Sequence, residues 1–120
     1  MAKFIQKPIV VQAAGNKPSV IEEYIGRVNS GTTTISVARV LSPGGWEEPP
    51  QNPRFTEYTL VIRGLLKVET QDGSFDVHAG QAIIMEPGER VRYSCPSPEG
   101  AEYVAICLPA FSHETVRRED

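Results

Sequence analysis

The sequence has few of the residues that build disulfide frameworks or metal centres, with two cysteines and two histidines in 120 residues. Two cysteines cannot form a disulfide framework or, alone, a four-thiolate zinc site. If the segments 90–95 and 102–108 pair as a hairpin, Cys95 and Cys107 lie roughly 16 Å apart at ~3.3 Å per residue, beyond disulfide reach. The sequence therefore predicts two reduced, structural thiols.

Long apolar runs and clusters of one charge are also missing. No segment approaches the ~20 apolar residues of a membrane span, and the first residues have no apolar stretch of signal-peptide length. The 15 acidic and 12 basic residues are spread along the chain, whereas nucleic-acid binding needs a concentrated basic face. We therefore expect a cytoplasmic protein without a nucleic-acid or membrane partner. The length of 120 residues predicts a single domain over residues 1–120.

What the sequence does contain is a series of short runs rich in β-branched residues. Turn residues separate them, at Gly64, 71–73, 87–88 and 96–100, and the proline-rich segment 42–53 reads as a loop beside the sheet. This pattern predicts an all-β antiparallel sandwich or barrel with a core over about residues 32–108. The predicted strands cover residues 32–41, 57–62, 65–70, 74–77, 82–85, 90–95 and 102–108.

The two ends of the chain are less regular. In the N-terminal segment 1–31, residues 9–11 could form an edge strand, and residues 20–25 either a helical turn or a further strand. The tail 109–120 is polar and charged, so we expect it to be solvated, with at most one helical turn.

Two segments of the chain have regularly spaced glycines. The first is Gly45-x5-Gln51-x-Pro53-x3-Glu57-x6-Gly64, or in another register Gly44-x5-Pro50-x-Asn52-x4-Glu57, and the second is Gly80-x5-Glu86-Pro87-Gly88-x2-Val91-x3-Cys95. Their spacing resembles the two motifs of the cupin superfamily, Gly-x5-His-x-His-x3-4-Glu-x6-Gly and Gly-x5-Pro-x-Gly-x2-His-x3-Asn. The resemblance implies an antiparallel jelly-roll β-barrel, also called a double-stranded β-helix.

The histidines that hold a divalent metal in typical cupins are missing at these positions. Only Glu57 is retained, and Val91 stands where the second motif has its histidine. His78 is expected on the surface, while His113 in the tail could fold back over the barrel mouth. We therefore expect no metal cofactor; the alternative is a divalent metal held through Glu57 and Gln51, with Asn52 or His113 as further ligands.

Strand alternation predicts which residues face the barrel interior. With Glu57 inward, Thr59 and Val61 share its face, while Tyr58, Leu60 and Ile62 point outward. An outer face this apolar predicts a second subunit, and hence a homodimer. In the next hairpin, alternation places Val91 and Tyr93 on one face together with Val104 and Ile106.

Arg39 is open to two interpretations. If Ile35, Val37, Arg39 and Leu41 face inward, Arg39 needs a buried partner, and Glu57 is the obvious candidate. If the register slips by one residue, Ser36, Ala38 and Val40 face inward and Arg39 lies in solvent.

The resemblance and the remaining polar residues predict a pocket for a small molecule. Trp46 and Arg54 lie on the loop at the mouth, and Gln51 occupies a former histidine position. One hypothesis is a binding barrel for a small organic acid or sugar, with Arg39, Trp46, Gln51, Arg54, Glu57 and Tyr93 as ligand-binding residues. The alternatives are an isomerase, epimerase or lyase with Glu57 as base and Tyr93 as proton donor, or a metal-dependent enzyme with an unusual site.

Overall fold

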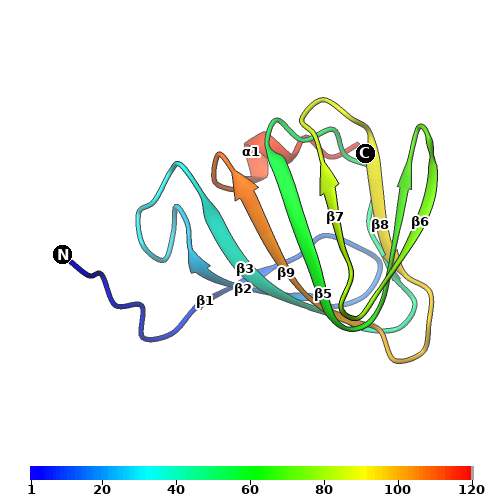
Figure 1. Cartoon of the computed structure of the whole chain (residues 1–120), viewed down its shortest axis with the longest axis horizontal. Coiled ribbons are helices and arrows are strands. Elements are labelled where there is room, and N and C mark those ends of the chain that lie inside the picture. The colour runs from blue at the N-terminus through cyan, green and yellow to red at the C-terminus, as the bar shows by residue number, and fades with distance from the viewer. Residues whose placement is uncertain (120) are drawn as a thin grey trace.

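The computed structural model describes residues 1–119 and is built almost entirely of strands (Figure 1). The short helix α1 (His113–Val116) follows the last strand, and no described helix has the length and apolar character that crossing a membrane requires. The predicted all-β class is confirmed. The strands are β1 (Ile9–Gln12), β2 (Val20–Ile25), β3 (Ser36–Ser42), β4 (Trp46–Glu47), β5 (Thr56–Thr70), β6 (Gly73–His78), β7 (Ala82–Met85), β8 (Val91–Cys95) and β9 (Ala101–Leu108).

Strand β5 organises the barrel, because its two halves pair with different neighbours. Its first half pairs with β7 and β9, and its second half with β6 and β8. Gly64, where the sequence predicts a break between two strands, instead lies inside one continuous strand with φ 81°. A Cβ atom there would collide with the carbonyl of Gly100, so glycine allows the strand to bend from one wall to the other.

The sheet runs in the order β1-β2-β3-β9-β5-β8-β4 and curls around a buried apolar core. The side chains of Val61, Leu66 and Val68 on β5 are fully buried. The predicted alternation on this strand is confirmed, since Glu57, Thr59 and Val61 are buried while Tyr58, Leu60 and Ile62 are exposed.

The pairing of the last two strands differs from the expectation. The segments 90–95 and 102–108 do not form a hairpin, because β8 pairs with β4 and β5 whereas β9 lies between β3 and β5. The inward residues of β9 are therefore Tyr103, Ala105 and Cys107, and the predicted shared face with Val104 and Ile106 is wrong. Both cysteines are nevertheless buried and free, as expected.

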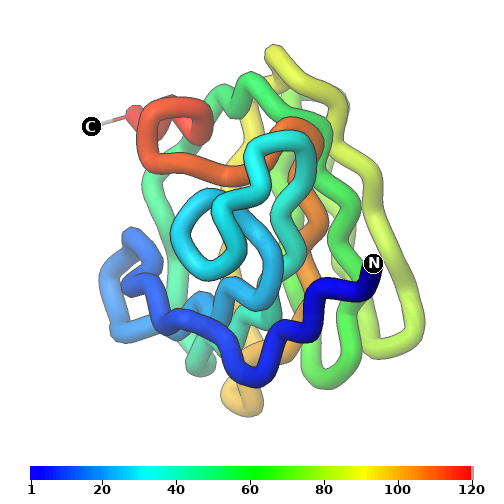
Figure 2. Tube along the Cα trace, turned by 90° about the vertical axis from the view of Figure 1, so that its left-hand side faces the viewer, coloured from blue at the N-terminus to red at the C-terminus, as the bar shows by residue number. Residues whose placement is uncertain are grey.

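The C-terminal residues 109–119, here called the strap, do not form the solvated tail that their composition predicts. Figure 2 shows them (red) lying against one end of the barrel. The amide of Asn52 donates to the carbonyl of Arg117 at 3.1 Å, and the amide of Glu119 donates to the carbonyl of Pro50 at 2.7 Å. Val116 is buried in a small cluster with Phe55 and Cys107. This burial offsets the loss of chain entropy and holds the strap over the barrel end.

Candidate functional site

A cavity of about 80 Å³ lies between the two walls of the barrel, beneath the strap and the loop 48–55. By the volume that one water molecule needs, it has room for roughly six water-sized groups. Its walls are mostly apolar and aromatic, with a small number of polar side chains among them. The apolar lining includes Val11, Ile21, Ala38, Val40, Trp46, Phe55, Ala105, Phe111 and Val116.

Glu57 projects into this cavity from the inner face of β5. Thr59 donates a hydrogen bond to its Oε2 at 3.1 Å, and the thiol of Cys107 lies 3.9 Å from Oε1. Burial raises the pKa of Glu57 to about 7, against the smaller opposing effect of these two hydrogen bonds. Near neutral pH this carboxyl group can therefore both release and accept a proton.

Glu48 is a second buried carboxyl group in the same cavity, and the sequence interpretation missed it. Burial, and after it the negative charge of Glu57, raise the pKa of Glu48 to about 8, while the positive charge of Arg118 opposes the shift. The signal that could have found it is alternation, since Glu48 follows the buried Trp46 by two residues where β4 pairs with β8. Treating the whole segment 42–53 as loop concealed that signal.

Three further polar side chains line the cavity with a buried atom that no described residue partners. They are the amide oxygen of Gln51, the hydroxyl of Tyr93 and Nε of Arg118. The backbone of Gln51 forms β-bridges with both Val91 and Arg118. Gln51 and Arg118, two of these three residues, are therefore on neighbouring backbone segments. Buried polar groups are rarely left unpaired, so these atoms mark places where a bound molecule would supply hydrogen bonds.

Tyr93 and Trp46 come from adjacent strands, and each has a distinct place in the cavity wall. Burial, followed by the charge of Glu57, raises the pKa of Tyr93 well above its usual value, so its hydroxyl stays protonated and can donate. Trp46 is 2% exposed, and its Nε1 donates to the carbonyl of Ala14 at 3.1 Å. Its polar atom is therefore occupied, and the indole ring contributes apolar wall.

A third glutamate at the cavity has its charge satisfied locally. Oε2 of Glu23 accepts hydrogen bonds from the amides of Val28 and Asn29 at 3.1 and 2.8 Å. These contacts tie β2 to the turn that follows it, so Glu23 serves the fold.

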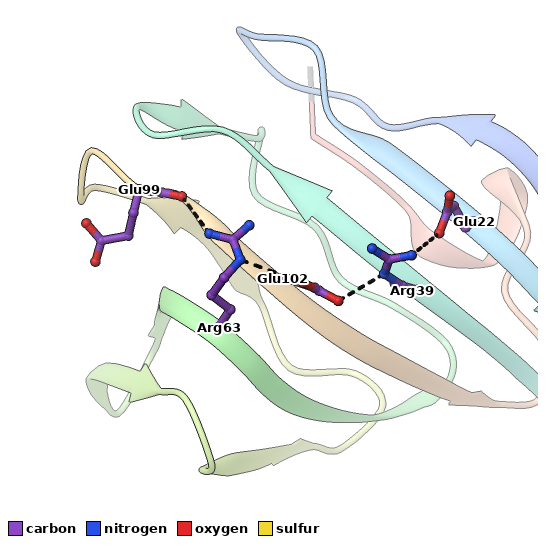
Figure 3. Close-up of polar contacts among 5 residues, drawn as sticks. All are labelled: Glu22, Arg39, Arg63, Glu99 and Glu102. Carbon is purple, nitrogen blue, oxygen red and sulfur yellow. Dashed lines mark hydrogen bonds and ion pairs between the residues drawn. The ribbon is translucent and has the colours of Figure 1, made fainter.

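Arg39 does not face the interior, which corrects the proposed pairing with Glu57. Figure 3 shows it on the outer face, between Glu22 of β2 and Glu102 of β9. Its nitrogens lie 3.1 Å from Glu22 Oε1 and 2.9 Å from Glu102 Oε2. The second interpretation of the β3 register is therefore correct. Ser36, Ala38 and Val40 face the cavity, and Arg39 lies on the opposite face beside two acids.

The other basic residue predicted at the mouth is also outside the cavity. Arg54 is exposed, and its backbone amide donates to the carbonyl of Thr115 at 2.8 Å. Phe55, the next residue, points inward and is 1% exposed. Among the predicted ligand-binding residues, the structure therefore brings together Trp46, Gln51, Glu57 and Tyr93.

The two histidines lie outside the cavity. His78 is exposed, as expected. The strap does fold over the barrel end, but His113 within it is exposed, with its ring against Phe111 and its Nδ1 3.3 Å from Nη1 of Arg118.

The sequence profile of the family described as "Cupin domain" matches residues 26–107 of this chain. The chain belongs to the cupin family. Solved cupins share its fold across nearly its whole length at low identity. A Streptomyces protein, PAC13, solved as a variant with uridine, is 18% identical with a TM-score of 0.75, covering 98% of this chain and 88% of its own. A predicted oxalate decarboxylase from Thermotoga maritima is 12% identical with a TM-score of 0.73, covering 91% and 99%.

Two further comparisons involve longer proteins. An oxalate decarboxylase variant from Bacillus subtilis is 16% identical with a TM-score of 0.75, over 95% of this chain and 31% of its own. A curated relative, Endoribonuclease YbeY of Myxococcus xanthus (strain DK1622), is 35% identical over 99 residues, which cover 82% of this chain and 34% of that protein. The chain thus spans about a third of the length of this curated relative.

The cavity of this cupin does not fit the metal that the family usually holds. The positions of the family's histidines carry Gln51 and Pro53, or Pro50 and Asn52, and then Val91. Among residues 1–119 no three His, Cys, Asp or Glu side chains are grouped as metal ligands. Glu48 and Glu57 are carboxyl groups that burial drives toward the protonated form, and imidazole is missing, so the donor set is a poor match for a transition metal.

Proposed function

We propose that this cupin binds a small polar organic molecule, an acid or a sugar, in the barrel without a resident metal ion. The observation that carries the proposal is the set of unpaired polar atoms inside an apolar cavity: Gln51 Oε1, Tyr93 OH and Arg118 Nε. Apolar walls with a few convergent polar groups are the usual composition of a ligand pocket. A bound molecule would remove the cost of leaving these groups unpaired.

The carboxyl groups of Glu48 and Glu57 add to this recognition set. In the protonated form each can donate one hydrogen bond and accept another, which suits ligand hydroxyl and carbonyl groups. The cavity volume of about 80 Å³ restricts a fully enclosed ligand to a few non-hydrogen atoms. A larger ligand would have to extend out of the cavity.

Three structural relatives support the same class of ligand. One was solved with uridine, which carries a sugar, and others are named for oxalate, a small acid. Because their identity to this chain is below 20%, they suggest compounds to test and do not identify the ligand.

The test is a binding screen by ligand-observed NMR with short carboxylic acids, aldoses, uridine and oxalate. Tyr93→Phe removes one hydroxyl and keeps the ring, so it should weaken the binding of any hit by about tenfold if that hydroxyl contacts the ligand. Tyr58→Phe is the matched control, because Tyr58 lies on the outer face and is 41% exposed. No binding across the screen, or equal binding by Tyr93→Phe, would refute the proposal.

A second candidate function is acid–base catalysis, as an isomerase, epimerase or lyase on a molecule of the same class. It is favoured by one observation, the pKa of about 7 that burial gives Glu57. A base is most effective when its pKa lies near the working pH, and the protonated Tyr93 in the same cavity could supply a proton. Incubating the screen compounds in D₂O would detect it, since wild type and not Glu57→Gln would exchange a C–H proton.

A further inference from the structure

Arg118 is the single basic side chain among the described residues that line the cavity. Its Nη1 is 3.3 Å from Nδ1 of His113, while its Nε is buried and has no hydrogen-bond partner within residues 1–119. The guanidinium group therefore offers the cavity a donor that residues 1–119 do not use.

The acids nearest to this guanidinium group do not pair with it. The positive charge of Arg118 lowers the pKa of Glu48 somewhat. However, no ion pair within 4.0 Å joins Arg118 to any described carboxylate. Three other arginines differ from it, since Arg39, Arg90 and Arg92 each contact an acid. A partly buried cation without a counter-ion is costly, and an anionic ligand would remove that cost.

The backbone holds Arg118 in this position. It is bridged to Gln51, and the flanking residues Arg117 and Glu119 are hydrogen-bonded to Asn52 and Pro50. Arg117 has φ 53° at the end of α1, which turns the chain so that Arg118 lines the cavity while Arg117 stays exposed. The backbone that carries the donor is thus in place before any ligand binds, which lowers the entropic cost of recognition.

We propose that the strap makes the site selective for a short hydroxycarboxylic acid, whose carboxylate binds Arg118 and whose hydroxyl group binds Gln51 Oε1 and Tyr93 OH. This inference rests on the proposed function and names its ligand class. Each half of such a ligand matches one unpaired atom type: the carboxylate accepts from Nε, and the hydroxyl donates to the amide oxygen of Gln51. A molecule such as glycolate has few enough non-hydrogen atoms for the cavity of about 80 Å³.

The experiment compares acids with their uncharged amides by ligand-observed NMR and calorimetry on the full chain. The probes are glycolate, lactate and glycerate, each paired with glycolamide, lactamide or glyceramide. Wild-type protein should bind at least one acid about tenfold more tightly than its amide, because a charge-assisted hydrogen bond is lost in the amide. Arg118→Met should abolish this preference, and Arg118→Lys should restore only part of it, since lysine lacks the planar fork.

Arg117→Met is the matched control, because it removes a neighbouring positive charge from an exposed position on the same strap. Thermal melting of each variant checks that the strap remains folded. An acid preference that survives Arg118→Met, or is lost equally in Arg117→Met, would overturn the inference. Binding of aldoses but of no acid would overturn it while leaving the proposed function standing, and no binding at all would defeat both.

Discussion

Thr59 lies two residues after Glu57 on the inner face of β5, and its hydroxyl donates to Glu57 Oε2 at 3.1 Å. This bond stabilises the charged carboxylate and so opposes the rise in pKa that burial causes. Thr59→Val keeps the shape and removes the donor. We expect it to raise the pKa of Glu57 further above about 7, measured by NMR titration of ¹³C-labelled glutamate. Thr56→Val on the same strand is the control, and an unchanged titration in Thr59→Val would show that the bond has no effect.

The free energy of unfolding should fall as the pH rises from about 4.5 to about 7, because Glu57 titrates differently in the folded and unfolded states. Its folded-state pKa of about 7 exceeds the usual 4.5, so between these values the folded protein keeps a proton that the unfolded chain releases. The difference corresponds to about 3 kcal/mol of unfolding free energy lost across that range. Chemical denaturation at several pH values should show a smaller loss in Glu57→Gln than in wild type or in Glu99→Gln, an exposed control. Equal pH dependence in all three would contradict the buried, protonated state.

Arg39 and Glu57 should behave as independent residues, because they lie on opposite faces of the sheet. A double-mutant cycle of Arg39→Met with Glu57→Gln should give additive changes in unfolding free energy. The cycle of Arg39→Met with Glu102→Gln should not be additive, because those side chains are 2.9 Å apart. Coupling between Arg39 and Glu57 would place Arg39 inside the barrel after all.

The outer face of β5 and β7 predicts a homodimer. Tyr58, Leu60, Ile62 and Ile84 are 41–59% exposed on adjacent strands, and a second copy would remove this apolar surface from water. Light scattering at micromolar concentration should give a dimer mass for wild type and a monomer mass for Leu60→Lys. Val28→Lys is the control, since Val28 is 64% exposed in the segment between β2 and β3, outside β5 and β7. A monomeric wild type would refute the prediction.

Protein purified without chelator or a metal-affinity tag should contain less than about a tenth of an equivalent of zinc, iron, manganese or nickel per chain, because the donor set lacks imidazole. Elemental analysis measures it, with Glu57→Ala as the comparison. Metal near one equivalent in wild type that is lost in Glu57→Ala would favour the alternative of a metal site built on Glu57 and Gln51.

The sequence by itself determined the fold class and the inward set on β5. Short β-branched runs, turn residues and the glycine spacing of two motifs are local features, and each limits the backbone wherever it occurs. The alternation that begins at Glu57 placed Thr59 and Val61 in the interior and Tyr58, Leu60 and Ile62 outside, because side chains along a strand alternate without reference to distant segments.

Only the tertiary structure decided which strands and segments lie against one another. A one-residue change of register reverses every side chain on a strand, so the direction of Arg39 depended on its neighbours Glu22 and Glu102, which lie on β2 and β9. Likewise, the composition of residues 109–119 predicts a solvated tail, and only burial of Val116 against Phe55 and Cys107 brings Arg118 to the cavity. Contacts between segments far apart in sequence have no local signature, and these contacts complete the candidate site.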